Sequence, residues 1–343
     1  MKDLTLEAIA KNCDCSITTV SRVINGNSKK YRISKAMTEK VMAEVTRSGY
    51  IPPFTAMSLR RGGSRMIGLL LPSIANPYFA DMASSIVKEL DKYDYTVILV
   101  DTMEDEHRLY ESARSLLLRR VEGMIAVPCG DNPEVLEQIG KEIPVVLIDR
   151  FYESTTLSYV TTNNFKGGQD GARTLIEAGH EKIVCIQGKR DSMPNQERVE
   201  GYMQAMKEAG LEKNAKVVGD EFSVQNGYLE TKVLLNGGNI PSAIFALSNT
   251  ILLGVLKAIH ESRLRVPEDI SIISYDDNMY MDYLTPPITR VGQPVENMAR
   301  LAVKILCDQM MQERRSDMVS QIRLMPSLIQ GQSVHFAQSL RKI

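Results

Sequence analysis

Near the N-terminus the chain reads TLEAIAKNCDCSITTVSRVINGN over residues 5–27, a stretch that predicts two short helices joined by a tight turn. Thr5 and Ser16 can begin helices, because a hydroxyl oxygen at that position accepts a hydrogen bond from a backbone amide of the first turn. Apolar residues then recur at the spacing of one helical face: Leu6, Ile9, Ala10 and Cys13, followed by Val20, Val23 and Ile24. Two helices connected in this way form the helix-turn-helix arrangement, in which the second helix enters the DNA major groove.

The outward side of the second predicted helix carries side chains that can recognise bases. These are Ile17, Thr18, Ser21, Arg22 and Asn25. An arginine can donate two hydrogen bonds to O6 and N7 of guanine, hydroxyl groups can reach base edges or phosphates, and an isoleucine can contact a thymine methyl group. The alternative interpretation is a solvated helix face with one stray isoleucine.

A third, longer helix is predicted between Ser34, which caps it, and Gly49, which ends it. The loop before it, residues 27–33, carries three cations that we expect near phosphates. Residues 1–65 contain 12 Lys and Arg against 5 Asp and Glu, whereas the rest of the chain contains 29 against 37. A basic head on an acidic body favours a nucleic-acid partner for the head, although a locally basic surface is the alternative.

Three segments resemble the headpiece of the lactose-repressor (LacI/GalR) family of transcriptional regulators: residues 6–10, 16–25 and 48–52. Asp14 stands where the family usually has a turn glycine, and we expect the turn to be kept because aspartate tolerates the left-handed conformation. Together with the helix face described above, the resemblance implies that the headpiece contacts DNA through the following residues: Thr5, Ser16, Ile17, Thr18, Thr19, Ser21, Arg22, Asn25, Lys29, Lys30 and Tyr31.

Residues 51–65 have the composition of a linker, with prolines at the start and a glycine pair near the end. Between them, two helical turns could form, too few to be stable alone in water. The resemblance implies a hinge helix that pairs with its twin in the minor groove and inserts a leucine between base steps, and Ala56 and Leu59 match that hinge. Pro53 departs from the family pattern, and an unstructured tether is the alternative.

Beyond residue 66, short apolar runs alternate with amphipathic helical stretches. The runs lie at residues 67–71, 96–100, 123–127 and 145–148, and then at 182–186, 243–246 and 270–274. Such alternation predicts parallel, doubly wound sheets, and the restart predicts two lobes of similar size. The expected fold class is α/β: an N-terminal all-α helix-turn-helix headpiece plus two doubly wound α/β lobes, periplasmic-binding-protein-like. We expect a headpiece over residues 1–50, a hinge or linker over 51–65, and an effector-binding and dimerisation domain over 66–343.

Polar and aromatic residues gather at the strand ends of this body, where doubly wound sheets bind their ligands. They include Asn76-Pro77-Tyr78-Phe79, Asp149-Arg150, Asn163-Asn164, Ser248-Asn249 and Asp276-Asp277. Groups able to hold hydroxyls, beside aromatics able to cover a ring face, suit a carbohydrate or a nucleoside. The family resemblance extends over this region and implies these effector-binding residues: Asn76, Phe79 and Arg150 in the first lobe, and Arg198, Phe222, Asn249 and Asp276 in the second.

Several of these assignments have a purely structural alternative. Asp276 could cap a helix, Arg198 could belong to a surface ion pair, and Phe222 could be plain core. Asn163 and Thr250 stand where the family usually has aspartate. The loss of two carboxylates could alter which hydroxyls are recognised, so the effector cannot be copied from a relative.

An enzyme is a weaker interpretation of the sequence than a DNA-binding regulator, because the chain has no Gly-rich dinucleotide fingerprint, no Walker loop and no nucleophile elbow. A solute-binding protein for uptake shares the two-lobe fold, but the missing signal-peptide core and the DNA-binding headpiece argue against it. Five scattered cysteines and four unclustered histidines suggest reduced thiols, no metal site and no cofactor.

No apolar run approaches the roughly 20 residues of a membrane span, so we expect a cytoplasmic protein with no membrane partner. No leucine heptads follow the segment over residues 325–333, so we expect a homodimer rather than a coiled-coil tetramer. A two-fold dimer implies a near-palindromic operator. We therefore predict a repressor of double-stranded operator DNA that is controlled by a small molecule in the interlobe cleft: a sugar or sugar derivative, with a nucleoside as the second choice.

Overall fold

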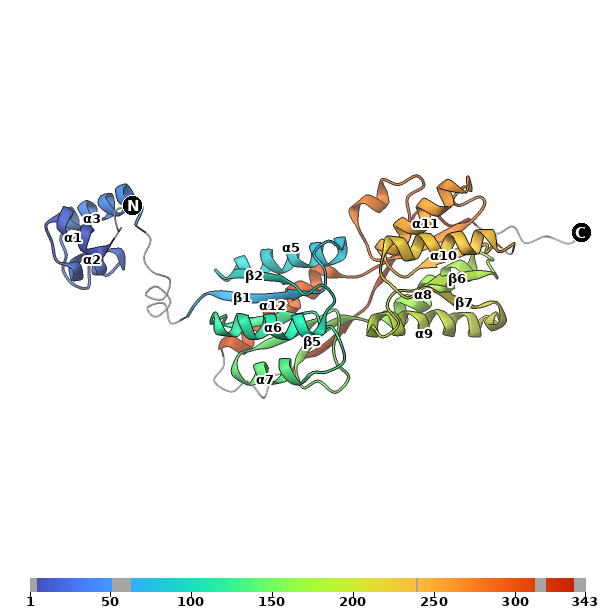
Figure 1. The fold of residues 1–343 in the computed structure, drawn as a ribbon, viewed down its shortest axis with the longest axis horizontal. Coiled ribbons are helices and arrows are strands. Elements are labelled where there is room, and N and C mark those ends of the chain that lie inside the picture. Colours follow the sequence, from blue (N-terminus) through green and yellow to red (C-terminus); the bar gives the residue numbers. More distant parts are fainter. Residues whose placement is uncertain (1–4, 51–62, 239, 312–318, 336–343) are drawn as a thin grey trace, which may run out of the picture. The chain divides into compact units, whose positions relative to one another are not determined.

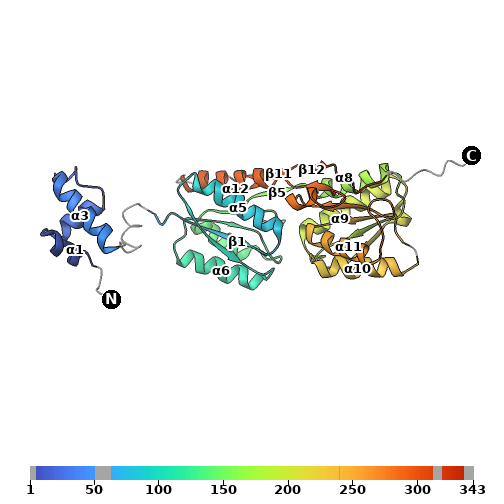
Figure 2. The same ribbon diagram turned by 90° about the horizontal axis from the view of Figure 1, so that it is seen from above.

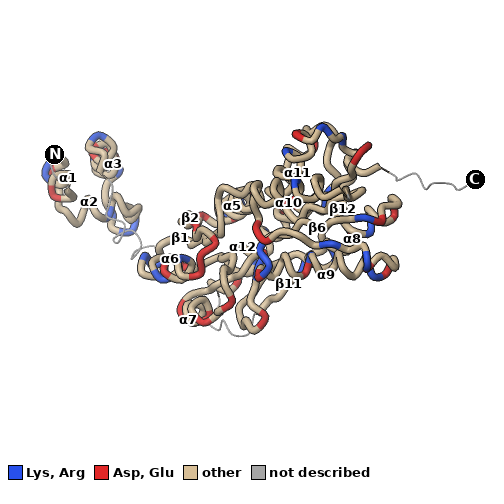
Figure 3. Tube along the Cα trace, turned by 45° about the vertical axis from the view of Figure 1, so that its right-hand side comes forward, with Lys and Arg blue, Asp and Glu red and all other residues tan. Residues whose placement is uncertain are grey.

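The structure is a computed structural model that describes residues 5–50, 63–238, 240–311 and 319–335. The chain divides into two compact units, Met1–Ser64 and Arg65–Ile343 (Figure 1). Acidic and basic residues are interspersed along both lobes of the second unit (Figure 3). Within the described ranges, no helix is both long enough and apolar enough to cross a membrane.

The described part of the first unit is a small helical headpiece. It contains α1 (Leu6–Cys13), α2 (Ile17–Ile24) and α3 (Lys35–Ser48). The predicted caps are confirmed, because Thr5, Ser16 and Ser34 each accept a hydrogen bond from a backbone amide of the first turn. The turn at Asp14 is kept as well, with φ 54° and ψ 50°. The predicted apolar faces meet in one core, whose buried members are Ile9, Ala10, Cys13, Val20, Val23 and Val41.

The first lobe of the second unit is built on a parallel sheet with the strand order β11-β5-β4-β3-β1-β2. Its strands are β1 (Met66–Leu71), β2 (Thr96–Asp101), β3 (Gly123–Ala126), β4 (Val145–Ile148), β5 (Ser158–Thr162) and β11 (Gln321–Leu324). Two layers of helices cover it: α5 (Pro77–Asp91) and α12 (Val295–Met311) on one face, α6 (Glu106–Leu118) and α7 (Glu134–Glu142) on the other (Figure 2).

The second lobe repeats this plan with the strand order β12-β10-β9-β8-β6-β7. Its strands are β6 (Ile183–Ile186), β7 (Lys216–Val218), β8 (Ala243–Ala246), β9 (Ser271–Tyr275), β10 (Thr289–Gly292) and β12 (Ser327–Ile329), of which β12 runs antiparallel to β10. One face packs against α8 (Asn164–Glu177) and α9 (Met193–Glu208), and the other against α10 (Val224–Asn236) and α11 (Asn249–Glu261). Two short 3₁₀ turns complete it, η1 (Glu212–Asn214) and η2 (Met279–Asp282).

Each of the seven predicted apolar runs contains a strand, which confirms the two doubly wound sheets. The strands β5, β7, β10 and β11 are not indicated by the sequence pattern. Their sequences are SYVTT, KVV, TRVG and QIRL. Short or polar segments of this kind lack the continuous apolar run that marks a buried strand.

The lobes are not sequential halves of the chain. In the described residues the chain passes between them three times, after β5, after β10 and after β11. Thus α12 and β11 follow the second lobe in sequence but belong to the first, where β11 pairs with β5 from Gln321 opposite Tyr159. Cavities lined by both lobes lie at the boundary between them.

Candidate nucleic-acid interface and ligand cleft

The headpiece presents the predicted base-reading side of α2 to solvent. Ile17 is 45% exposed although it is a large apolar residue, and its neighbour Thr18 is exposed as well. Arg22 is half-buried, because its guanidinium carbon lies 3.9 Å from the centre of the Tyr31 ring. Lys30 lies 5.8 Å from the same ring. The loop between α2 and α3 therefore orients the arginine by a cation–π contact in addition to carrying cations.

Other predicted DNA-contacting residues form local hydrogen bonds. Thr5 and Ser16 cap helices, and the Ser16 hydroxyl oxygen also lies 2.9 Å from that of Thr19. The Asn25 amide donates to the Ser21 hydroxyl oxygen over 3.1 Å. These bonds fix the side chains along α2, which reduces the entropy that they would lose on binding a partner.

The remaining predicted DNA-contacting residues are two lysines of the loop before α3 and the hinge residues. Lys29 and Lys30 are exposed, as expected for residues that would meet phosphates. Ala56 and Leu59, the predicted hinge residues, lie outside the described residues, as does Pro53. The hinge helix therefore stays a prediction.

In the body, a chamber between the lobes brings together six of the seven predicted effector-binding residues. It is lined by Asn76, Phe79 and Arg150 from the first lobe and by Arg198, Phe222 and Asp276 from the second. Its cavity volume is about 30 Å³. The remaining residue, Asn249, is fully buried behind the chamber, and its backbone amide donates to a carboxylate oxygen of Asp276 over 3.1 Å.

Arg198 is 4% exposed and is held by neutral partners. Its Nε donates to Oδ1 of Asn164 over 2.8 Å, and Nη1 donates to the carbonyl of Leu247 over 2.9 Å. The guanidinium also lies 3.7 Å from the centre of the Tyr275 ring. Within the described residues Arg198 forms no ion pair, so the surface ion-pair alternative is wrong.

Asp276 lines the chamber and also caps a helix, as its structural alternative predicted. It follows β9, has φ 73°, and is 3% exposed. One carboxylate oxygen caps the first amide of α11, and the other accepts a hydrogen bond from the side-chain amide of Gln293 over 2.8 Å. Asp277 instead pairs with Arg290 at 2.7 Å, so the two adjacent carboxylates have different partners.

The first lobe presents an equivalent carboxylate. Asp149 follows β4, has φ 68°, is 3% exposed, and accepts a hydrogen bond from the Tyr78 hydroxyl over 2.6 Å. That hydroxyl also lies 3.2 Å from Oε1 of Gln293, which completes a hydrogen-bonded connection from Asp149 to Asp276 across the lobes. Burial raises the pKa of Asp149, and burial followed by the Asp149 carboxylate raises the pKa of Tyr78.

Two phenyl rings line the same chamber. Phe79 lies on α5 and is 4% exposed, whereas Phe222 precedes α10 and also packs against the core of the second lobe. Phe222 therefore packs against the core of the second lobe and also lines the chamber. The Phe222 ring lies directly against Gly188, where only glycine fits, because a Cβ there would lie 2.2 Å from a ring carbon.

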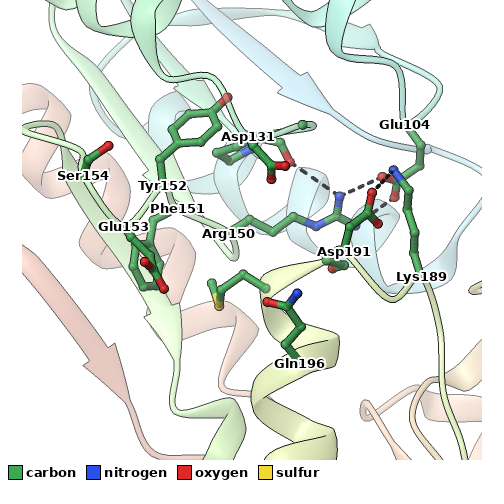
Figure 4. Close-up of a pocket in the computed structure, with 14 residues that line it drawn as sticks. Glu104, Asp131, Arg150, Phe151, Tyr152, Glu153, Ser154, Lys189, Asp191 and Gln196 are labelled. Atoms are coloured by element: carbon green, nitrogen blue, oxygen red, sulfur yellow. Dashed lines mark hydrogen bonds and ion pairs between the residues drawn. The ribbon is translucent and has the colours of Figure 1, made fainter.

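Arg150 separates this chamber from a wider one. Its Nη1 and Nη2 donate to the two carboxylate oxygens of Glu104 over 2.7 and 2.8 Å, a bidentate pair. Beyond it, the outer chamber has a cavity volume of about 420 Å³. Figure 4 shows Arg150 and Glu104 on the first-lobe side, with Lys189 and Asp191 from the second lobe facing them.

Several lining residues were not predicted from the sequence: Glu104, Asp131, Lys189, Asp191, Ser192 and Gln293. They lie in loops whose composition carries no signal, and only the fold places them together. At the two positions where the family usually has aspartate, Asn163 caps α8 by accepting from the Lys166 amide over 2.9 Å, and the Thr250 hydroxyl lies 3.0 Å from that of Ser248. Asn163 thus keeps a capping role that aspartate could also fill.

Comparison with known families gives two matches. Residues 5–53 match the bacterial regulatory proteins of the lacI family, and residues 172–334 match a periplasmic binding protein-like domain. The ribose operon repressor of Haemophilus influenzae is 33% identical over 304 residues, which cover 88% of this chain and 90% of that protein. The HTH-type transcriptional repressor PurR of Aliivibrio salmonicida is 31% identical over 335 residues, which cover 96% and 99%.

A solved structure shows the same architecture. The crystal structure of the Lac repressor dimer bound to operator and the anti-inducer ONPF superposes with a TM-score of 0.84 at 26% identity. The alignment covers 97% of this chain and 100% of that one. The predicted fold class is confirmed over nearly the whole chain.

Proposed function

The chain belongs to the lacI family of bacterial regulatory proteins, and we propose on this premise that it binds a near-palindromic operator as a homodimer under the control of a sugar or sugar derivative. It is a transcriptional repressor with an effector-binding body, not an enzyme. We propose that the effector binds in the chamber between the lobes and that the outward side of α2 recognises DNA. Binding to operator DNA would place the protein in the cytoplasm.

The observation that carries the effector assignment is the lining of the inner chamber. Arginines, carboxylates and an asparagine from both lobes converge there beside two phenyl rings. Among the described residues, Nε of Arg150 and the hydroxyl of Ser192 are buried in this lining without a hydrogen-bond partner. Buried polar atoms are nearly always bonded, so these two are suited to a polar ligand.

A sugar fits this lining better than other small molecules. Its hydroxyl groups both donate and accept, so they can satisfy arginines and carboxylates together, while Phe79 and Phe222 cover the apolar faces of a ring. The relative from Haemophilus influenzae is named for a ribose operon, which supports the same class. A purine is the second candidate, because the relative from Aliivibrio salmonicida is named PurR and aligns over 96% of this chain.

The headpiece assignment rests on Arg22 and its neighbours. Arg22 would donate to a guanine from the outward side of α2, with Thr18 and Ser21 at adjacent base edges or phosphates. Lys29 and Lys30 would lie over the backbone, and Tyr31 would contribute to DNA binding by orienting Arg22. The paired hinges, with Ala56 and Leu59 in the minor groove, complete the proposal.

A thermal-shift screen of sugars, sugar phosphates, nucleobases and nucleosides tests the effector class. A ligand at 100 times its dissociation constant should stabilise the protein by about 2.7 kcal/mol. Fluorescence anisotropy with a palindromic operator, with and without the hit, then measures control of DNA binding. A hit that stabilises the protein but leaves operator affinity unchanged would contradict the regulatory part of the proposal. Stabilisation by nucleobases alone would replace the sugar by the second candidate.

A further inference from the structure

The charges around the cleft are predominantly negative. Among the described residues that line the inner chamber, three carboxylates, Glu104, Asp149 and Asp276, face two guanidinium groups, Arg150 and Arg198. The outer chamber shows the same imbalance, with four acidic residues against two basic ones. Buried charges are poorly screened by salt, so this excess acts directly on whatever enters.

The cation at the boundary of the two chambers is already neutralised. Glu104 holds Arg150 by two parallel hydrogen bonds, and only 11% of the Arg150 side chain is exposed. Hydrogen bonds to Glu104 raise the pKa of Arg150 against the effect of burial. On the opposite wall, Lys189 lies 3.4 Å from Asp191 (Figure 4). An anionic ligand would therefore have to displace a resident carboxylate at either position.

The other inner cation is flanked by carboxylates. Arg198 uses Nε and Nη1 on neutral acceptors of its own lobe, and both Asp149 and Asp276 line the same small chamber. The three groups together carry a net negative charge. A phosphate that approached Arg198 would bring about −1.5 to −2 charges beside two buried carboxylates.

We propose that the effector is an uncharged, unphosphorylated sugar, and that Glu104 excludes phosphorylated sugars by occupying the guanidinium of Arg150. This inference rests on the proposed sugar-binding function and narrows it. A neutral hydroxyl can donate to a carboxylate and accept from an arginine, so it enters without displacing Glu104. A phosphate ester offers chiefly acceptors at neutral pH, so it competes with Glu104 for one cation.

The first test needs no variant. Thermal shift and calorimetry on the full-length protein compare pairs of neutral sugars and their phosphates, beginning with D-ribose and D-ribose 5-phosphate, together with inorganic sulfate. We expect stabilisation by a neutral sugar, at least about tenfold weaker binding of its phosphate, and no saturable binding of sulfate. Tighter binding of the phosphorylated member of a pair, or saturable sulfate binding, would overturn the inference while leaving the sugar-binding function intact.

The second test assigns the exclusion to Glu104. Glu104→Gln keeps the size of the side chain but removes the carboxylate that holds Nη1 and Nη2 of Arg150, whose Nε still lies 3.7 Å from Asp149. Sulfate and the sugar phosphate should therefore each bind about tenfold more tightly or better. Glu153→Gln removes the same charge from an exposed residue of the outer chamber and is the matched comparison, with a smaller gain expected. Equal gains in the two variants, or none in Glu104→Gln, would show that Glu104 does not exclude anions.

The failure of the broader proposal gives a different result. If neither sugars nor sugar phosphates bind and a nucleobase does, the sugar function is wrong and this inference falls with it. Sulfate binding gained only in Glu104→Gln would still show that the carboxylate excludes anions from the cleft. Binding of sugars, sugar phosphates and nucleobases to the wild-type protein therefore distinguishes a failure of the sugar-binding function from a failure of anion exclusion by Glu104.

Discussion

Arg22 in the headpiece and Arg198 in the body make the same contact in opposite surroundings. Arg22 lies 3.9 Å from the centre of the Tyr31 ring, and Arg198 lies 3.7 Å from that of Tyr275. Tyr31, however, is 44% exposed, whereas Tyr275 is fully buried and Arg198 is also hydrogen-bonded to its own lobe.

The difference matches two kinds of recognition. An arginine that is oriented by one exposed ring keeps access to a large partner such as DNA, and its interactions are weakened by salt. An arginine that is fixed in the interior is preorganised for a small ligand, and its removal leaves buried acceptors unsatisfied. The four predictions below test this contrast, from the largest expected effect to the smallest.

Replacing Arg22 should have the largest effect. Arg22→Ala should cost about 1–3 kcal/mol of operator affinity per half-site, hence twice that for the dimer, and relax specificity at one base pair. Fluorescence anisotropy on operator and random DNA gives the ratio. Arg47→Ala, an exposed arginine on α3 that pairs with Glu44 at 2.6 Å, is the control. An unchanged ratio in Arg22→Ala would mean that Arg22 does not read a base.

Arg198→Ala should abolish most effector binding and also weaken the fold. Losing a charged hydrogen-bond donor should reduce ligand affinity about 10- to 150-fold, and the stranded acceptors Asn164 and Leu247 should lower the free energy of unfolding by about 2 kcal/mol or more. Calorimetry and urea unfolding measure the two effects. Arg173→Ala, a surface residue paired with Glu208, should change neither. Wild-type effector affinity in Arg198→Ala would remove the residue from the site.

Tyr31 should matter less, because it acts through Arg22. Tyr31→Ala should weaken operator binding by about 0.5–1 kcal/mol per half-site, the usual worth of an exposed cation–π contact. Tyr31→Phe keeps the ring and should bind like wild type. The combination of Arg22→Ala with Tyr31→Ala should lose little more than Arg22→Ala alone. Full additivity of the two losses would show that Tyr31 does not position Arg22.

The smallest effect concerns pH. Burial raises the pKa of Asp149 above its ordinary value of 3.8, so the folded protein holds this proton more tightly than the unfolded chain does. The resulting stability is fully present below that ordinary value and is lost as pH rises through the folded pKa. Asp149→Asn should therefore flatten the fall in unfolding free energy that sets in as pH rises above that ordinary value. The exposed Asp131→Asn should leave that slope alone, and an equally steep slope in Asp149→Asn would rule out this contribution.

Local chemistry explains why the headpiece could be predicted from the sequence. Thr5, Ser16 and Ser34 cap helices through amides three residues ahead, and the apolar faces repeat within single helices. Such signals lie within a few residues of each other, so they survive in the sequence without knowledge of the fold. The family motifs also predicted seven effector-binding residues, and six of them line the inner chamber. Among these, Asn76 begins a helix, and Arg150 and Asp276 follow strands.

What the sequence determined by itself is therefore the headpiece, the two doubly wound sheets and the strand-end positions of the candidate effector site. Only the tertiary structure decided that α12 and β11 return to the first lobe and that Glu104 holds Arg150. It also decided that Asp149 and Asp276 connect through Tyr78 and Gln293. Those pairs are separated by 17 to 215 positions in the chain, and no local periodicity or spacing records a contact that long-range packing creates.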